Sequence, residues 1–183
     1  MERNNLNGKV VLIAGGGKNL GALLSRDFAV KGAKLAIHFN SENSKAESEK
    51  TLAEVKGLGA EAFLFQGDLT KVENVTKFFD EAIAKFGGID IAINTVGMVL
   101  KKPFTETTEA EYDVMFGVNS KAAYFFLQEA GKKINDNGKI CTIVTSLLAA
   151  YTGLYSTYAG AKAPVEHFTR AASKEFGARG ISV

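Results

Sequence analysis

The sequence has few of the residues that disulfide-rich and metal-binding proteins need. Of its 183 residues, one is cysteine and two are histidine. The single cysteine, Cys141, has no partner for a disulfide within the chain, and its place in an apolar strand-like run predicts a small core residue. The histidines, His38 and His167, are far apart and lie in no cluster of cysteines or carboxylates, so we expect no metal site.

Long apolar runs and a strong net charge are absent as well. The sequence holds no apolar segment long enough to span a bilayer and no apolar leader near its N-terminus, so we expect no membrane association and a cytoplasmic location. The formal net charge is +2, with basic residues scattered rather than gathered in a stripe, so we expect no nucleic-acid partner. Residues 1–183 suit a single domain with a sizeable core.

A regular alternation of apolar runs and helical patterns is what the sequence does contain. The predicted strands are 10–14, 34–39, 61–66, 89–94 and 139–145. The predicted helices are 20–31, 44–57, 71–86, 109–135 and 156–178. This alternation predicts an α/β fold, a three-layer doubly wound parallel sheet of the Rossmann type, in which ligands bind at the carboxyl ends of the strands.

Helix starts are indicated by capping-box patterns, in which glutamate follows serine or threonine by three residues. The pairs are Ser44 with Glu47, Thr70 with Glu73, and Thr108 with Glu111.

The first predicted strand runs directly into a glycine-rich loop. The loop reads Gly15-Gly16-Gly17-Lys18-Asn19-Leu20-Gly21 and opens the first predicted helix. Glycines let the backbone approach a pyrophosphate closely, and a helix N-terminus offers free N–H groups and the positive end of its dipole. A plain tight turn would also use glycines, but the place after the first strand favours a nucleotide-binding loop.

A second group of residues indicates proton transfer. Tyr158 precedes Lys162 by four residues in a helical segment, which puts both side chains on one face, and Ser146 lies upstream. An ammonium group about 4 Å from a phenolate stabilises it by roughly 4 kcal/mol at an effective dielectric of about 20. A phenol so placed exchanges its proton near neutral pH, where general acid–base catalysis works best. Alone, this spacing is also common on ordinary amphipathic helices, so its catalytic interpretation depends on the other motifs.

Together these motifs resemble the short-chain dehydrogenase/reductase family. Its glycine motif, Thr-Gly-x-x-x-Gly-x-Gly, overlays residues 14–21, with Ala14 in place of the threonine and Asn19 in place of the middle glycine. Asparagine tolerates a positive φ, so the loop can keep its shape. The resemblance runs from Leu6 onward and implies strand order 3-2-1-4-5. It also implies sixth and seventh strands beyond Val183, so that the C-terminal part of the domain is expected to be missing here.

The resemblance implies roles for individual residues. The matching catalytic positions are Asn119, Ser146, Tyr158 and Lys162. By resemblance, Tyr158 is the general acid/base, Ser146 binds the substrate oxygen, and Lys162 assists Tyr158 and binds the nicotinamide ribose. Asn119 is expected to position a water that joins Lys162 to solvent. Taken singly, Ser146 also fits a strand-end cap and Asn119 a helix-kink residue. The implied cofactor-binding residues are Gly15, Gly17, Lys18, Asn19, Leu20, Gly21, Asn40, Ser41, Asp68, Leu69, Asn94, Gly97, Tyr158 and Lys162.

The end of the second predicted strand bears on the choice of cofactor. Phe39 takes the place of the aspartate that would bind the adenosine ribose diol, and the next acidic residue is Glu42. Without a carboxylate there, a 2′-phosphate is not repelled, and Lys18, Asn40 and Ser41 are candidates to bind it. On its own, Lys18 fits a solvated loop charge almost as well. The sequence favours NADP(H) and leaves NAD(H) as the alternative.

We therefore expect an NAD(P)-dependent alcohol dehydrogenase or carbonyl reductase, which interconverts a ketone or aldehyde and an alcohol by hydride transfer. The expected partner is a small carbonyl or alcohol substrate. A catalytically silent NADP-binding regulator on the same fold is the alternative, against which the intact set of Ser146, Tyr158 and Lys162 argues. By resemblance, the helices near 109–135 and 156–178 should pack against another subunit in a homotetramer or dimer.

Overall fold

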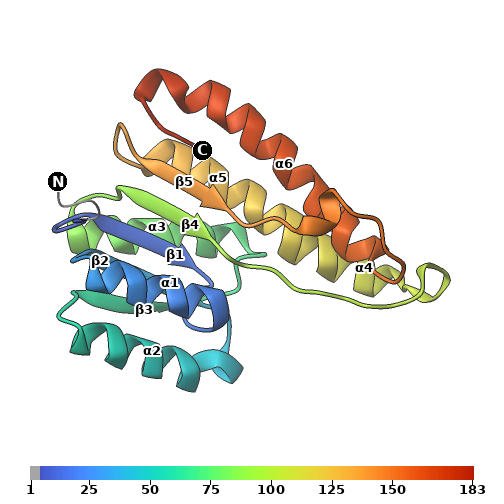
Figure 1. The fold of residues 1–183 in the computed structure, drawn as a ribbon, viewed down its shortest axis with the longest axis horizontal. Helices are drawn as coiled ribbons and strands as arrows, with labels where there is room; N and C mark the ends of the chain where they lie inside the picture. Colours follow the sequence, from blue (N-terminus) through green and yellow to red (C-terminus); the bar gives the residue numbers. More distant parts are fainter. Residues whose placement is uncertain (1–4) are drawn as a thin grey trace.

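Five parallel strands form the central sheet of the computed structural model, which describes residues 5–183 (Figure 1). The strands are β1 (Val10–Ala14), β2 (Lys34–Phe39), β3 (Ala62–Gln66), β4 (Ile91–Asn94) and β5 (Lys139–Thr142). Their order across the sheet is β3-β2-β1-β4-β5, and each neighbouring pair is parallel. The predicted fold class and strand order are confirmed.

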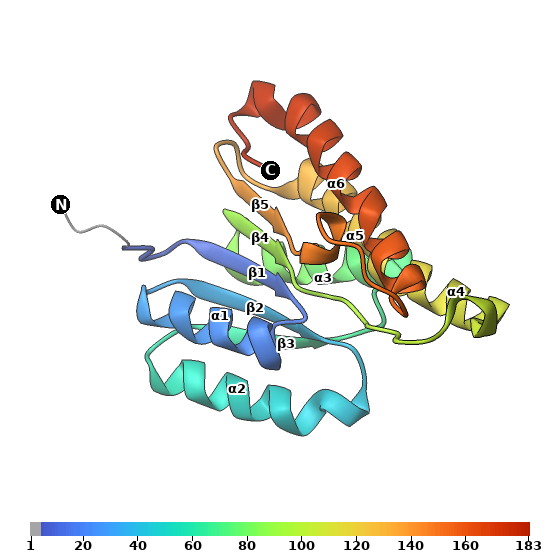
Figure 2. The same ribbon diagram turned by 45° about the vertical axis from the view of Figure 1, so that its right-hand side comes forward.

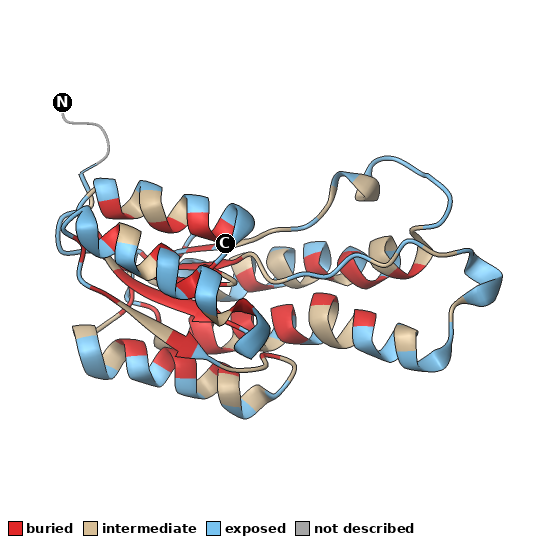
Figure 3. Ribbon diagram, turned by 90° about the horizontal axis from the view of Figure 1, so that it is seen from below, coloured by how far each residue is buried: buried red, intermediate tan, exposed pale blue. Residues whose placement is uncertain are grey.

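Helices cover both faces of this sheet. They are α1 (Asn19–Val30), α2 (Lys45–Gly57), α3 (Val72–Phe86), α4 (Glu109–Phe116), α5 (Ala122–Lys133) and α6 (Ser156–Phe176). The helices α1 and α2 pack on one face, and α3, α5 and α6 lie on the other (Figures 1 and 2). Buried residues concentrate in the sheet and on the helix sides that face it (Figure 3).

The middle strand β1 joins the two halves of the core. Every residue of its sequence, Val-Val-Leu-Ile-Ala, is buried, as a strand covered on both faces requires. Successive side chains point to opposite faces, so Leu12 belongs to the hydrophobic cluster under α3 and α5, and Ile13 to the cluster under α1 and α2. Because β1 lies at the centre, its carboxyl end reaches the middle of the sheet edge where ligands of such folds bind.

The long helix predicted over 109–135 is interrupted. Between α4 and α5, residues Gly117–Lys121 form a π-helical turn that contains the buried Asn119. π-Turns inside α-helices are rare and occur frequently at functional sites.

Of the predicted capping boxes, the structure confirms one. The Thr108 hydroxyl accepts from the Glu111 N–H, while the Glu111 carboxylate accepts from the Thr108 N–H at 2.9 Å. At Ser44 the predicted helix start is confirmed, because Ser44 is the N-cap residue of α2. The box itself does not form, because the Ser44 hydroxyl donates to the Ser41 carbonyl at 3.0 Å instead of capping the helix. The prediction at Thr70 is wrong as well, because it lies one residue before the N-cap of α3.

Cys141 is exposed, so its prediction as a core residue is wrong. Within β5, Ile140 is buried in the cluster under α5, while Cys141 points to the opposite face. That face of β5 is open to solvent in the described part of the chain. An apolar run shows that a strand is present, but not that both of its faces are covered.

Past α6, the chain returns to the outer side of β5. Ser182 forms a single parallel bridge with Lys139, as the beginning of a sixth strand would. Further strands beyond Val183 stay a prediction.

Candidate functional site

Hydroxyl groups of α1 and α2 donate hydrogen bonds to the carbonyls of the glycine loop between β1 and α1. The buried Ser25 donates to the Gly16 carbonyl at 3.0 Å, and the buried Thr51 donates to the Gly17 carbonyl at 2.8 Å. A Cβ on Gly17 would overlap the hydroxyl of Ser48. The loop therefore lies against α1 and α2 with no room for side chains on its inner side.

Two loop residues account for the way α1 begins. A Cβ on Gly21 would overlap the Gly15 carbonyl, so only glycine allows this close approach. Asn19 has φ of 50°, which is the left-handed conformation that asparagine tolerates better than most residues. The expected loop shape is confirmed at Asn19.

An open cavity of about 1190 Å³ follows the carboxyl ends of the strands from this loop. Most of the predicted cofactor-binding residues line it: Gly15, Gly17, Lys18, Asn19, Leu20, Gly21, Asn40, Ser41, Asp68, Leu69 and Gly97. Asn94 is buried at the end of β4, where its side-chain oxygen accepts from the Val96 N–H at 2.9 Å. Tyr158 and Lys162 are not among the lining residues of this cavity.

Asn119 holds the loop that follows β4. Its side-chain oxygen accepts from the Met98 N–H at 3.0 Å, and its side-chain nitrogen donates to the Met98 carbonyl at 2.9 Å. Each polar atom of the side chain thus makes one bond to protein backbone, which leaves one N–H and one lone pair for a further partner. A Cβ on Gly97 would lie 3.2 Å from the Asn119 oxygen and 3.1 Å from the Lys162 ammonium. The structure therefore brings Asn119 and Lys162 together at Gly97.

Lys162 is buried at the ends of β4 and β5, with 4% of its surface exposed. Its ammonium donates to the Val96 carbonyl at 3.1 Å and to the Ile143 carbonyl at 3.0 Å. Within residues 5–183, both hydrogen-bond partners are carbonyls, and no carboxylate pairs with it. Burial lowers the pKa of Lys162 below its usual value, because desolvation disfavours the charged form.

Tyr158 and Ser146 lie on two segments that contact each other. Tyr158 is half-buried on α6, one turn before Lys162, and its ring centroid is 6.5 Å from that of Tyr155. Ser146 is exposed and begins a 3₁₀ turn (Ser146–Leu148) that contacts α6. The side chains of Ser146 and Tyr158 form no hydrogen bond with each other or with Lys162.

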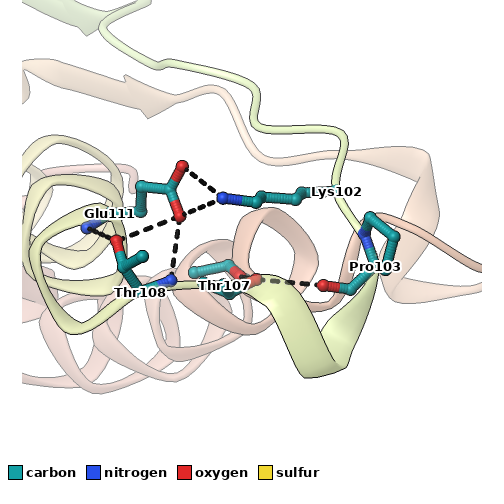
Figure 4. A network of polar contacts seen from close by, with 6 residues as sticks. Lys102, Pro103, Thr107, Thr108 and Glu111 are labelled. Carbon is teal, nitrogen blue, oxygen red and sulfur yellow. Dashed lines mark hydrogen bonds and ion pairs between the residues drawn. The ribbon is translucent and has the colours of Figure 1, made fainter.

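The outer end of the β4–α4 loop is fastened by an ion pair (Figure 4). The Lys102 ammonium lies 2.9 Å from both carboxylate oxygens of Glu111. The backbone N–H of Thr108, together with this ammonium, holds the pKa of Glu111 at about 2. The Lys102 N–H also donates to the Leu154 carbonyl at 2.8 Å. These contacts join the loop after β4 to the loop that leads into α6.

His38 takes part in the site in a way that its sequence context hardly reveals. Its ring is buried in β2, with Nδ1 2.9 Å from the Gly15 nitrogen and Nε2 2.7 Å from the Gly67 oxygen. Burial lowers the pKa of His38 to about 4, against the opposing effects of the Gly67 carbonyl and the Asp68 charge. The one sequence signal for this role is that a histidine interrupts an otherwise apolar strand.

Residues 5–183 contain neither a cluster of metal ligands nor a membrane-spanning helix. No three or more His, Cys, Asp or Glu side chains are grouped to hold a metal ion. No helix in this range is long and apolar enough to cross a membrane.

The parallel sheet, with a glycine loop at the carboxyl end of its first strand, defines a nucleotide-binding α/β protein of the Rossmann type. The sequence profile described as short chain dehydrogenase matches residues 9–183. The chain therefore belongs to the short-chain dehydrogenase/reductase family of oxidoreductases.

Similar proteins are known from structure and from sequence. A putative dehydrogenase from Burkholderia cenocepacia, solved with bound NADP, is 64% identical with a TM-score of 0.95, over 98% of this chain and 68% of that one. A blue fluorescent protein from a metagenomic library, in complex with NADPH, is 31% identical with a TM-score of 0.90, over 97% and 72%. Hydroxynaphthalene reductase-like protein Arp2 of Metarhizium brunneum is 35% identical over 181 residues, 98% of this chain and 67% of its own length. The chain thus spans about two thirds of these relatives.

Proposed function

We propose that the protein is an NAD(P)-dependent oxidoreductase that interconverts a ketone or aldehyde and an alcohol, with Tyr158 as the general acid/base. The observation that carries this proposal is the state of Lys162. It is a buried ammonium group that has no carboxylate partner among residues 5–183, at the carboxyl ends of two strands and one turn from a tyrosine. Buried charges in proteins are normally paired, and strongly perturbed ionisable groups cluster at functional sites.

The residues around the cavity fit a dinucleotide. Gly17 and Gly21 let the loop pack tightly against Ser48 and the Gly15 carbonyl, which fixes the loop backbone at the start of α1. Helix α1 has no side-chain cap at Lys18, so the N–H groups of its first turn are available to an anion. The cavity then continues past Asp68 and Leu69 on one side and Gly97 on the other, which provides room for both halves of the cofactor.

Each proposed catalytic residue has a distinct task. When bound, the nicotinamide supplies or accepts the hydride. In the reductive direction, Tyr158 donates its proton to the carbonyl oxygen, and the Ser146 hydroxyl donates a hydrogen bond to that same oxygen. Lys162 stabilises the phenolate that remains and offers its third N–H to the ribose hydroxyls of the cofactor. Asn119 shapes the loop at Met98, because its side chain bonds both the N–H and the carbonyl of that residue.

We further propose a preference for NADP(H). Asn40 and Ser41 follow β2 and line the cavity together with the exposed Lys18. The nearest acidic residue in the sequence, Glu42, is ion-paired with Lys45 at 2.9 Å and is not part of the lining. In the described part of the chain, no carboxylate at this end of β2 is therefore placed to repel a 2′-phosphate. The bound NADP of the Burkholderia cenocepacia relative and the NADPH of the metagenomic protein support this preference.

Assembly through α5 and α6 is proposed as well. Phe126 is fully buried in the core, but Tyr124 is 45% exposed and packs edge-on against Phe125 and Phe168. An exposed aromatic cluster on two long helices fits contact with a second copy of the chain. Light scattering of the purified protein should show a dimer or tetramer, and a monomer at micromolar concentration would contradict this assembly.

The function is tested by NADPH oxidation over a panel of ketones and aldehydes, with the full-length protein. Tyr158→Phe removes the proposed acid and should lower kcat by about 10²–10⁴-fold. Tyr155→Phe is the matched control, since it removes a hydroxyl one turn earlier on the same chain, and should stay within about threefold of the wild type. Tight NADPH binding without any turnover would favour the silent regulator instead.

A further inference from the structure

We propose that His38 is a positioning residue for the cofactor: its ring ties the glycine loop after β1 to the end of β3. The two segments that it joins line the same cavity, with Gly15 on one and Asp68 on the other. This inference rests on the proposed function, because it concerns how the proposed cofactor site keeps its shape.

The hydrogen bonds of the ring specify one state of the imidazole. The Gly15 N–H, 2.9 Å from Nδ1, can only donate, and the Gly67 carbonyl, 2.7 Å from Nε2, can only accept. Nδ1 must therefore be the unprotonated nitrogen, and Nε2 must carry the hydrogen. A protonated ring has a hydrogen on both nitrogens and could not accept from Gly15. The connection between the two segments thus requires a neutral His38.

The surroundings of the ring keep it neutral. It is 2% exposed, and the ring centroids of Phe65 and Phe78 lie 6.3 Å and 5.6 Å from its own. Asp68 is the charged group whose field reaches the ring, and it favours protonation, as does the Gly67 carbonyl. Burial outweighs both and holds the pKa of His38 at about 4.

The ring joins residues whose positions matter for binding. Gly15 begins the loop that would lie under the pyrophosphate, and Gly67 directly precedes Asp68 and Leu69. The Gly67 N–H donates to the Phe39 carbonyl at 3.0 Å. Both the N–H and the carbonyl of Gly67 are therefore bonded to residues of β2. In Figure 2, β2 lies between β1 and β3, which lets one side chain of β2 reach both neighbours. Loss of the ring would remove the side-chain acceptor of the Gly15 N–H.

Two variants of the same size separate positioning from packing. In His38→Asn, the amide oxygen occupies nearly the place of Nδ1 and can still accept from Gly15. In His38→Leu, the side chain has the same shape but no acceptor. Phe65→Leu is a control that changes the packing beside the ring and removes no hydrogen bond. Each protein would be checked for folding by circular dichroism, and its NADPH dissociation constant would be measured by fluorescence titration at pH 7.

We expect the substitutions at His38 to change the NADPH dissociation constant and to leave kcat almost unchanged. His38→Leu should bind NADPH about tenfold more weakly than His38→Asn, because it removes the acceptor that holds the Gly15 N–H. His38→Asn keeps the bond to Gly15 but loses the one to Gly67, so its dissociation constant should lie between those of the wild type and His38→Leu. Phe65→Leu should stay within about threefold of the wild type, and kcat at saturating NADPH should change by less than about threefold in all three variants. Folded His38→Leu with the dissociation constant of His38→Asn would overturn the proposal.

A second measurement needs no variant. The ¹⁵N spectrum of the wild-type histidines at pH 7 should show His38 as the neutral Nε2–H tautomer. A protonated ring or an Nδ1–H tautomer would overturn the proposal even if both variants fail to fold. If instead the proposed function is wrong, the wild type should bind neither NADPH nor NADH, while the His38 tautomer is still the expected one.

Discussion

His38 should make the stability of the protein depend on pH between neutrality and pH 5. Its pKa is lowered from 6.5 to about 4 in the folded state, so in this range the unfolded chain binds a proton that the folded protein does not. Stability therefore rises with pH and is lost as the pH falls below the unfolded value. With these two pKa values, linkage gives a loss of about 2 kcal/mol in the free energy of unfolding from pH 7 to pH 5, and about 3 kcal/mol once the pH is below 4.

The assay is urea unfolding, followed by circular dichroism at several pH values for the wild type and His38→Leu. Carboxylates whose pKa is lowered on folding, such as Asp90 and Glu129, also reduce the free energy of unfolding when acid protonates them. They are the same in both proteins, so they cancel in the difference. The wild type should lose about 2 kcal/mol more than the variant between pH 7 and pH 5. Parallel pH profiles of the two proteins would refute the reasoning.

Three further predictions concern the cofactor site and the core. Lys162→Met removes the cation beside the proposed acid and should lower kcat at least about 100-fold in a steady-state assay while the protein stays folded. Ser41→Asp places a carboxylate where a 2′-phosphate is proposed and should weaken NADPH binding about tenfold with little effect on NADH, as measured by titration. Glu129 is 4% exposed, and its carboxylate lies 2.8 Å from the ammonium groups of Lys132 and Lys133. Glu129→Gln should lower the free energy of unfolding by roughly 2 kcal/mol, as measured by urea unfolding. Unchanged kcat, unchanged NADPH affinity or unchanged urea midpoint would contradict these predictions in turn.

The sheet was predictable because its strands are apolar on both faces. β1 was predicted to the residue, since Val10–Ala14 is a continuous apolar run bounded by a lysine and a glycine. The end of β5 was not, because the apolar sequence continues to Val144 while the strand stops at Thr142. After that residue the chain turns into a 3₁₀ segment capped by the Thr145 hydroxyl. Apolar composition does not distinguish these two conformations.

The site was predictable to the extent that it depends on strand ends. Parallel strands bring their carboxyl ends to one edge, so Gly15, Asp68 and Gly97 had to lie near each other, and the structure places them around one cavity. Contacts between distant segments were not predictable. The two bonds from Asn119 to Met98, and those from His38 to neighbouring strands, join residues about 20 to 30 positions apart and have no local sequence pattern.

Hydride transfer itself tests the central claim most directly. NADPH would be prepared with deuterium at C4 of the nicotinamide, in each of the two stereochemical forms. Each form would be incubated with the full-length protein and the carbonyl panel, and the deuterium content of the alcohol products would be measured by mass spectrometry. The account predicts one deuterium in the alcohol from one of the two labelled forms, and almost no labelled alcohol with Tyr158→Phe. Bound NADPH with no labelled alcohol from any carbonyl, or equal labelling with Tyr158→Phe, would contradict it.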